Sequence, residues 1–373
     1  MKRSLLQLGC SAVLAVAFAS ASEAQAVGPS AQRMDEVVRY YADGPQPTFM
    51  GVVLVARGTD VLFAKAYGMA NLEWSIPHTL STKLAIGSNS KQVTAAAILL
   101  LEERGKLRVT DPIKSYLPDS PAAWDAITFH HLLSHTAGLI GTAPADRGNV
   151  LPARPERTIE RFRNLPLQFA PGTSFSYSNA GYQLLAYLIE RTSGQRYEDF
   201  VRQSIFEPLG MKESGSATHA PIIPSLASGY VKEPGGAFRH APFIDLSNGM
   251  GAGSLYSTVG DLHRWTLGLF GGKLLRSDSL TKMTTPVSGG YAYGLGVATR
   301  LGRRQLSHGG GVSGFVSAVT YFPESQVTVV ALSNLPSGES IEKQPPIIVL
   351  SEWLGILAHG ETVNLPPRRS APQ

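Results

Sequence analysis

Ser88 and Lys91 stand three residues apart at the start of a long apolar run, residues 92–101. On a helix, side chains at this spacing lie on one face, one turn apart. A serine hydroxyl is a weak nucleophile until a neighbouring base takes its proton. Lysine can be that base only where burial or nearby charge lowers its pKa, and the apolar run predicts such burial. The helix N-terminus would also favour a developing oxyanion. The pair therefore indicates nucleophilic catalysis.

Spacing alone does not identify the pair, because Ser279-Leu280-Thr281-Lys282 has it too, and there we predict a capped start of a surface helix. A second segment supports the first pair. Tyr177 and Asn179 precede another apolar helix. A phenol can exchange protons with Lys91, and an amide can hold both the lysine and a substrate carbonyl. The alternative is that Tyr177 belongs to the core and Asn179 is an N-cap.

A third segment, Leu306-Ser307-His308-Gly309-Gly310-Gly311, is predicted as a strand end that leads into glycines. Glycines allow a substrate backbone to approach closely, and their N–H groups can face an oxyanion. The alternative is a strand end followed by a flexible turn.

In this order the segments resemble the signature of the serine β-lactamase and penicillin-binding-protein superfamily, in its class C β-lactamase-like branch. That branch has Ser-x-x-Lys, then Tyr-x-Asn, then a third element that can be His-x-Gly, as at His308 and Gly310. The resemblance spans about residues 30 to 335. Flanking segments also match the branch: 105–118, 131–139 and 253–262.

The resemblance implies a role for each residue of the first two motifs. Ser88 would be the acylated nucleophile, and Lys91 and Tyr177 would handle protons, either of the two being the base. Asn179 would orient the substrate amide.

For the third motif the resemblance implies binding roles. Gly310 and Gly311 would lie along the substrate, and the N–H groups of Ser88 and Gly311 would form the oxyanion hole. His308 would stand where β-lactamases place a lysine that meets the substrate carboxylate. A neutral imidazole attracts a carboxylate less than an ammonium does. This favours D-Ala-D-Ala-type peptidases and esterases over efficient β-lactam hydrolysis.

Three other patterns are given structural interpretations. His130, His131 and His135 have helical spacing but no convincing third ligand or partner glutamate, so we expect capping and packing, with no metal and no cofactor. The run His308 to Gly311 imitates a lipase oxyanion motif, yet no Gly-x-Ser-x-Gly elbow exists in the chain. Gly309 to Gly314 fits the nucleotide-binding pattern Gly-x-Gly-x-x-Gly. A strand follows it rather than a helix, which argues against a nucleotide site.

Two functions agree with these observations. The first is a serine hydrolase that cleaves amide, ester or lactam carbonyls through an acyl-enzyme, with a small molecule or a peptide as substrate: a cell-wall peptide, an ester or a β-lactam. The second is a non-catalytic relative that binds cell-wall peptides or another protein. A binder has no need of a lysine and a tyrosine beside the serine, which favours the enzyme.

The segments around the motifs predict an α+β fold, an antiparallel sheet flanked by N- and C-terminal helices with an inserted helical lobe. We expect the sheet lobe over 27–84 and 246–360 and the helical lobe over 85–245, with a cleft at their junction. Periodicity and punctuation predict helices over 31–42, 129–135, 180–190, 197–206 and 347–357, besides the one that follows Ser88 and stops at Gly105. Strands are predicted over 51–56, 61–67, 293–299, 304–307, 315–322 and 327–332.

The N-terminus predicts export. Residues 1–26 have two basic residues, an apolar run and Ala24-Gln25-Ala26 as a cleavage site, with Ala21 as a second possible end. Cys10, the only cysteine, has a poor lead-in for a lipoprotein, so the mature chain would lack both disulfide and thiol. No other stretch is long and apolar enough to span a membrane. We therefore expect a periplasmic or secreted protein, with a loose tail over 361–373.

Charge argues against nucleic acid as a partner. The net charge of +5 is scattered along the chain without a basic stripe.

Overall fold

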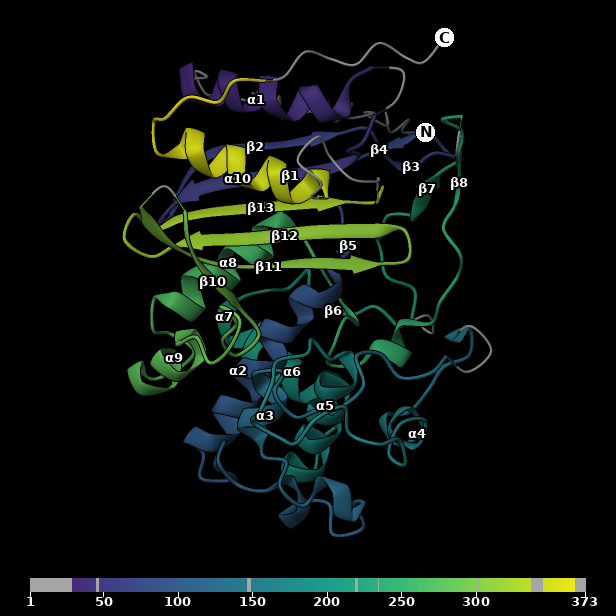
Figure 1. Cartoon of the computed structure of the whole chain (residues 1–373). Coiled ribbons are helices and arrows are strands. Elements are labelled where there is room, and N and C mark those ends of the chain that lie inside the picture. The colour runs from purple at the N-terminus through teal and green to yellow at the C-terminus, as the bar shows by residue number, and fades with distance from the viewer. Residues whose placement is uncertain are drawn as a thin grey trace, which may run out of the picture.

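A six-stranded antiparallel sheet forms the upper part of the molecule in a computed structural model (Figure 1). The structure describes residues 29–44, 47–145, 149–218, 221–233, 235–300, 302–336 and 345–365. The strands run in the order β10-β11-β12-β13-β1-β2, so the first hairpin of the chain pairs with the last strand. Their bounds are β1 Gly51–Arg57, β2 Asp60–Tyr67, β10 Gly296–Arg300, β11 Arg303–Val312, β12 Phe315–Phe322 and β13 Val327–Ser333.

Two terminal helices, α1 (Pro29–Ala42) and α10 (Pro346–Ala358), cover one face of this sheet (Figure 1). They bury the apolar side chains that their 3.6-residue periodicity predicts, among them Met34, Val37 and Leu350. The opposite face packs on a larger apolar cluster that includes α8 (Val259–Phe270) and the buried helix α2 (Ser90–Glu103). The predicted α+β class and the two flanking helices are confirmed.

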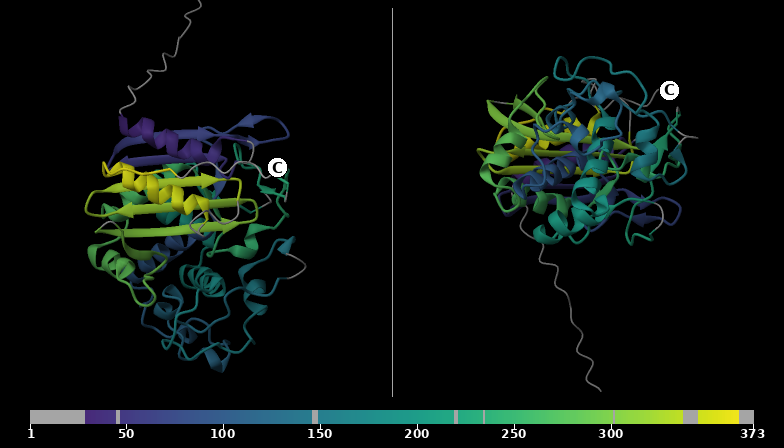
Figure 2. Two further views of the ribbon diagram at one scale, coloured as in Figure 1. Left: turned by 45° about the horizontal axis from the view of Figure 1, so that its top comes forward. Right: turned by 90° about the horizontal axis from the view of Figure 1, so that it is seen from below.

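The middle of the chain is mainly helical and lies below the sheet in Figure 1. A second view shows the same two layers from another side (Figure 2). The elements here are α3 Phe129–Leu133, α4 Pro155–Glu160, α5 Asn179–Ser193, α6 Tyr197–Val201, a π-helix Arg202–Phe206, α7 Glu207–Leu209 and α9 Ser277–Thr284. Among the short strands, β3 Met69–Asn71 pairs with β4 Ile76–Pro77, and β7 Tyr230–Lys232 pairs with β8 Phe238–His240. A three-stranded sheet has β9 Leu255–Ser257 between β5 Leu84–Ala85 and β6 Gly215–Ser216.

Several predicted boundaries are wrong. Helix α3 ends at Leu133 rather than at residue 135, because His135 adopts a left-handed φ of 59° that a helix does not tolerate. The segment predicted to stop before Pro208 continues through the π-helix and α7 to Leu209, and Gly210 then ends it with a φ of 69°. Proline is tolerated there because it stands in the first turn of α7.

The third motif lies inside a strand rather than after one. Strand β11 was predicted over 304–307 but runs to Val312, so His308 to Gly311 are strand residues. Gly310 pairs with Ser317 of β12. This pairing with β12 extends the strand beyond the four residues that were predicted. Strand β10 starts at Gly296 rather than at residue 293, since Gly294 has a left-handed φ of 72°.

Some predictions concern residues outside this description. The predicted signal peptide, residues 1–26, and the predicted tail beyond residue 365 lie outside the described residues, and the lobe boundaries stay predictions. Among the helices that the structure does describe, none is long and apolar enough to cross a membrane.

Candidate active site

Ser88 lies on a 3₁₀ turn, Gly87–Asn89, between strand β5 and helix α2. The serine therefore precedes the α-helix, which starts at Ser90, and the prediction that Ser88 shares a regular helix face with Lys91 needs this correction. Gly87 has a φ of 51°, and a Cβ there would come within 2.6 Å of the Gly311 nitrogen. Only glycine allows this turn to sit so closely against β11. Ser88 itself remains half-buried.

Lys91 is fully buried behind the serine. Its Nζ lies 3.0 Å from Ser88 Oγ, 2.7 Å from Asn179 Oδ1 and 2.8 Å from the carbonyl oxygen of Ala252. Burial lowers the pKa of Lys91 to about 7, because the charged form loses its hydration. A neutral amine has two N–H donors and one lone pair. The two carbonyl oxygens can take both donors, which leaves the lone pair directed at the Ser88 hydroxyl.

Tyr177 closes the other side of this group. Its ring centroid lies 4.8 Å from Lys91 Nζ. Burial raises the pKa of Tyr177 to about 12, partly offset by a hydrogen bond with Ser88, although 37% of the residue's surface remains exposed. The phenol therefore stays protonated at neutral pH. This exposure argues against Tyr177 as a simple core residue.

Asn179 is the first residue of α5 and is not its N-cap. Ser178 is the cap, since its hydroxyl accepts a hydrogen bond from the Gly181 N–H at 3.0 Å. The Asn179 side chain is thereby left to accept from Lys91 and to donate from Nδ2 to Thr142 Oγ1 at 3.3 Å.

His308 faces the same group from strand β11. Its Nδ1 lies 2.5 Å from the Gly309 carbonyl oxygen, which can only accept, so we assign the proton to Nδ1. Its Nε2, 2.9 Å from the Tyr291 hydroxyl, is then an acceptor. Burial, with the nearby charge of Lys91 as a smaller cause, lowers the pKa of His308 to about 4. The imidazole is neutral near pH 7 and presents no charge to a substrate carboxylate.

Gly310 and Gly311 bring β11 into contact with the serine turn. A Cβ on Gly310 would come within 2.0 Å of the Ile86 carbonyl oxygen and 2.3 Å of Ser317 Oγ. At Gly311 no atom lies within 4 Å of the corresponding position, so this residue faces open space. The structure thus brings together the residues of all three motifs. Their catalytic and binding roles, including the N–H groups of Ser88 and Gly311 as an oxyanion hole, stay predictions.

A buried chain of hydrogen bonds behind the serine escaped the sequence analysis. Asn89 Nδ2 donates to Ser317 Oγ at 2.7 Å, and that hydroxyl donates to the Ile86 carbonyl oxygen at 2.7 Å. Gln92 donates to Asn89 at 2.9 Å and accepts from the Trp265 indole at 3.1 Å. The chain ties the serine turn to β12 and α8. In the sequence, the only indication of this chain of hydrogen bonds was the presence of polar residues within an apolar run.

His135 lies in an aromatic cluster beside Tyr177, their ring centroids 4.3 Å apart. Its Nδ1 accepts a hydrogen bond from the Ser178 N–H at 3.0 Å, which fixes the backbone next to Tyr177. His131 takes part in the capping box of α3, and His130 contacts the Tyr293 hydroxyl at 2.6 Å. Within the described ranges, no three His, Cys, Asp or Glu residues are placed to hold a metal ion.

The second Ser-x-x-Lys copy does not form such a site. Both residues lie on α9, where Lys282 Nζ forms an ion pair with Glu102 at 2.8 Å. Ser279 is buried, and no side-chain cap is present at the start of this helix, contrary to the prediction.

The chain is similar to known proteins in sequence and in fold. The model of the β-lactamase family matches residues 39–350. The protein PbpX of Bacillus subtilis is 32% identical over 294 residues, which cover 79% of this chain and 72% of that protein. The D-alanyl-D-alanine-carboxypeptidase/endopeptidase AmpH of Escherichia coli is 29% identical over 277 residues, 71% of this chain and 69% of AmpH. A crystal structure of a penicillin-binding protein from Bacillus halodurans superimposes with a TM-score of 0.72 at 28% identity, covering 82% of this chain and 95% of the other.

Proposed function

The chain belongs to the β-lactamase family, whose relatives are serine hydrolases, and on that premise we propose that it is an exported enzyme that forms an acyl-enzyme on Ser88. The observation that carries this proposal is the environment of Lys91. A fully buried lysine whose two N–H donors have carbonyl acceptors and whose lone pair faces a serine hydroxyl is suited to act as a base.

In the first step, Ser88 Oγ attacks the substrate carbonyl carbon and its proton passes to the neutral amine of Lys91. The carbonyl π electrons move to the oxygen, which the N–H groups of Ser88 and Gly311 stabilise. Lys91 is a better base at neutral pH than Tyr177, because the pKa of Lys91 is about 7 whereas that of Tyr177 is about 12.

In the second step, the tetrahedral intermediate collapses and the bond to the leaving group breaks. Protonated Tyr177 supplies the proton that the leaving amine or alkoxide needs, and Lys91 returns its own proton to the phenolate. A water molecule then attacks the acyl-enzyme with the same groups as base and acid. This attack releases the carboxylic acid and restores the Ser88 hydroxyl.

The substrate class follows from His308. A neutral imidazole, held by Tyr291 and the Gly309 carbonyl, gives weaker attraction for a carboxylate than an ammonium would. We therefore propose peptide amides and esters as substrates ahead of β-lactams. A relative whose name includes endopeptidase activity supports the peptide part of this proposal.

A non-catalytic binding protein is the alternative that the sequence left open. Such a protein gains nothing from burying a lysine, because that burial destabilises the charged form. The desolvated Lys91 within hydrogen-bond distance of Ser88 is therefore the observation that favours catalysis.

Covalent labelling tests the proposal. We expect a fluorophosphonate or penicillin probe to label the full chain at Ser88, which peptide mass spectrometry would locate. The variant Ser88→Ala should remain folded and unlabelled, whereas Ser279→Ala, which changes the serine of the second Ser-x-x-Lys copy, should label like the wild type. Equal labelling of wild type and Ser88→Ala, or no labelling of either, would contradict the acyl-enzyme.

A further inference from the structure

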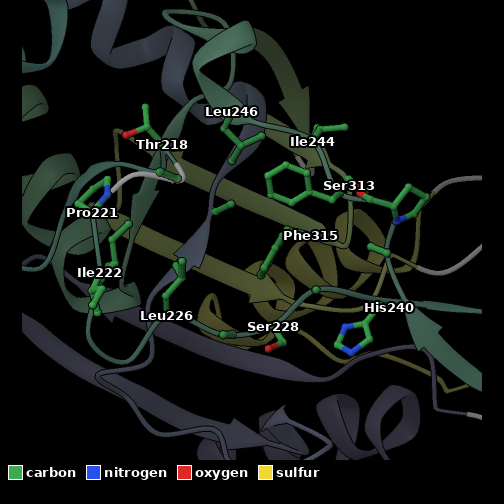
Figure 3. A pocket seen from close by; sticks show the side chains of 18 residues that line it. Thr218, Pro221, Ile222, Leu226, Ser228, His240, Ile244, Leu246, Ser313 and Phe315 are labelled. Carbon is green, nitrogen blue, oxygen red and sulfur yellow. The ribbon is translucent and has the colours of Figure 1, made fainter. Parts of the chain in front are cut away.

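A pocket of about 780 Å³ opens on the side of the β11–β12 connection (Figure 3). Its described walls come from residues 217–218, 221–223 and 226–229, from residues 240–244 with Leu246, and from Ser313 and Phe315 at the β11–β12 turn. Ala85, on strand β5, belongs to the same wall. This volume lies within the range of small-molecule sites.

Most of the residues that line the pocket have apolar side chains. Its described lining consists mostly of alanine, proline, isoleucine, leucine and phenylalanine, with hydroxyl groups from Thr218, Ser228 and Ser313. His240 is the only titratable residue in that lining, and its Nε2 lies 2.6 Å from a carboxylate oxygen of Glu73. No lysine or arginine among these residues could neutralise an anionic ligand. The lining fits an uncharged apolar group.

Large apolar side chains remain exposed at this pocket. Ile222 is 95% exposed and Leu226 is 40% exposed. Figure 3 shows both on the wall opposite the β11–β12 turn. Covering such side chains with an apolar ligand removes them from water, which is favourable in proportion to the area covered.

The nucleophile is within reach of the pocket. Ala85 precedes Ser88 by three residues, and adjacent Cα atoms are about 3.8 Å apart, so their Cα atoms lie within about 11 Å. Ser313 follows Gly311 by two residues, which places it within about 8 Å of the predicted oxyanion donor. These separations are short enough for the acyl part of a substrate on Ser88 to span.

The direction of β11 indicates which part of the substrate lies toward the pocket. Tyr177 and Tyr291 pack near His308, with ring centroids 6.2 Å and 5.7 Å from the imidazole. Ser313 lies five residues further along, a distance of about 17 Å in extended chain. Since Tyr177 protonates the leaving group in the proposed mechanism, the leaving group departs at the His308 end. The acyl group then extends toward the pocket.

From these observations we infer that the pocket binds an uncharged, apolar acyl group, either an alkyl chain of several carbons or an aryl group. This inference rests on the proposed function and specifies its substrate. The enzyme is then selective for substrates with an apolar acyl side, and small acyl groups leave the pocket unused.

A series of p-nitrophenyl esters tests this inference, since acetate, butyrate, hexanoate and octanoate share one leaving group. Complete burial of one methylene is worth up to about a fourfold change in kcat/KM. We expect kcat/KM of the wild type to rise at least tenfold from acetate to octanoate. Leu226→Glu places a charge in the pocket and should lower the octanoate-to-acetate ratio about tenfold. Ile222→Glu, at the more exposed position, should lower it in the same direction without a risk to folding.

Leu165→Glu is the matched control, because Leu165 is 36% exposed and does not line the pocket. It should leave the ratio unchanged. A flat chain-length profile in an enzyme whose Ser88 is labelled by fluorophosphonate would overturn the pocket inference alone. Equal ratios in Leu226→Glu, Ile222→Glu and Leu165→Glu would do the same. Absence of both labelling and ester turnover would overturn the proposed function together with it.

Discussion

Lys91 shows how one side chain can be both fully buried and reactive. The ammonium form can donate to all three neighbouring oxygens, those of Ser88, Asn179 and Ala252. The neutral form keeps the Asn179 and Ala252 contacts and accepts from Ser88 instead. Both protonation states are therefore satisfied by one arrangement of atoms, so proton transfer needs little rearrangement.

The pH dependence of the rate follows from this residue. Since the pKa of Lys91 is about 7 in the folded protein, its base form is lost as the pH falls through 7. We expect kcat/KM to show an acid limb with an apparent pKa near 7, measured with p-nitrophenyl acetate. His308, with a pKa of about 4, and Tyr177, with a pKa of about 12, should add no second limb between pH 5 and 9.

Two results would contradict this assignment. A limb near pH 4 would point to His308, and a rate that does not change between pH 6 and 8 would exclude Lys91 as the base. Lys91→Arg provides the control, because a guanidinium keeps its proton throughout this range and should abolish turnover at every pH.

At the scale of elements, the site depends on how closely strand β11 lies against the 3₁₀ turn that carries Ser88. The Ile86 carbonyl oxygen accepts from Ser317 of β12, and Gly310 lies against that same oxygen. Asn89 holds Ser317 from the other side. These contacts set the separation of the Ser88 and Gly311 N–H groups, which the oxyanion proposal requires.

Gly310→Ala should therefore damage the site although it adds one methyl group. Its Cβ would lie 2.0 Å from the Ile86 oxygen, so the turn or the strand must move. A shift of about 1 Å in a catalytic group can cost about 100-fold in rate, and overpacking costs about 1–3 kcal/mol in the free energy of unfolding. We expect losses of that size in kcat/KM and in urea denaturation.

Gly311→Ala is the matched comparison for stability. It lies on the same strand, and its Cβ would meet no atom within 4 Å, so the free energy of unfolding should change by less than about 1 kcal/mol. Equal destabilisation by the two substitutions would contradict the close contact at Gly310.

At the scale of the whole molecule, both ends of the described chain build one layer. Strand β1 pairs with β13 along its full length, and α1 packs beside α10 on the same face of the sheet (Figure 1). The intervening residues supply the helices that carry Lys91 and Asn179. The sheet supplies His308, Gly310 and Gly311. The site therefore forms only when segments from distant parts of the chain come together.

Export is the whole-molecule prediction. We expect the protein in the periplasmic or culture fraction of a bacterial host, with a mature N-terminus at Val27, or at Ser22 if cleavage follows Ala21. Cell fractionation and N-terminal sequencing would check this. A variant that lacks residues 2–26 should stay in the cytoplasm and keep fluorophosphonate labelling. Recovery of an uncleaved chain in the cytoplasm would contradict export.

Residue type and spacing made Ser88 and Lys91 candidates, but spacing alone did not separate them from Ser279 and Lys282. The order of the three motifs, and the family resemblance that this order carries, added Tyr177 and Asn179 and predicted which residues meet in the site. Alternation and helical periodicity also predicted the first hairpin, β12, β13, α1 and α10, since those elements bury one regular face.

Long-range packing set the properties that local pattern could not contain. The length of β11 depends on pairing with β12, and glycine-rich sequence gives no local indication of a strand. The lowered pKa of Lys91 depends on burial by distant segments, and the position of its Nζ depends in part on the Ala252 carbonyl, 161 residues away. The apolar pocket likewise combines residues near 85, 222, 240 and 313. Sequence therefore determined which groups take part, whereas tertiary contacts determined their pKa values, their separations and the space left for a substrate.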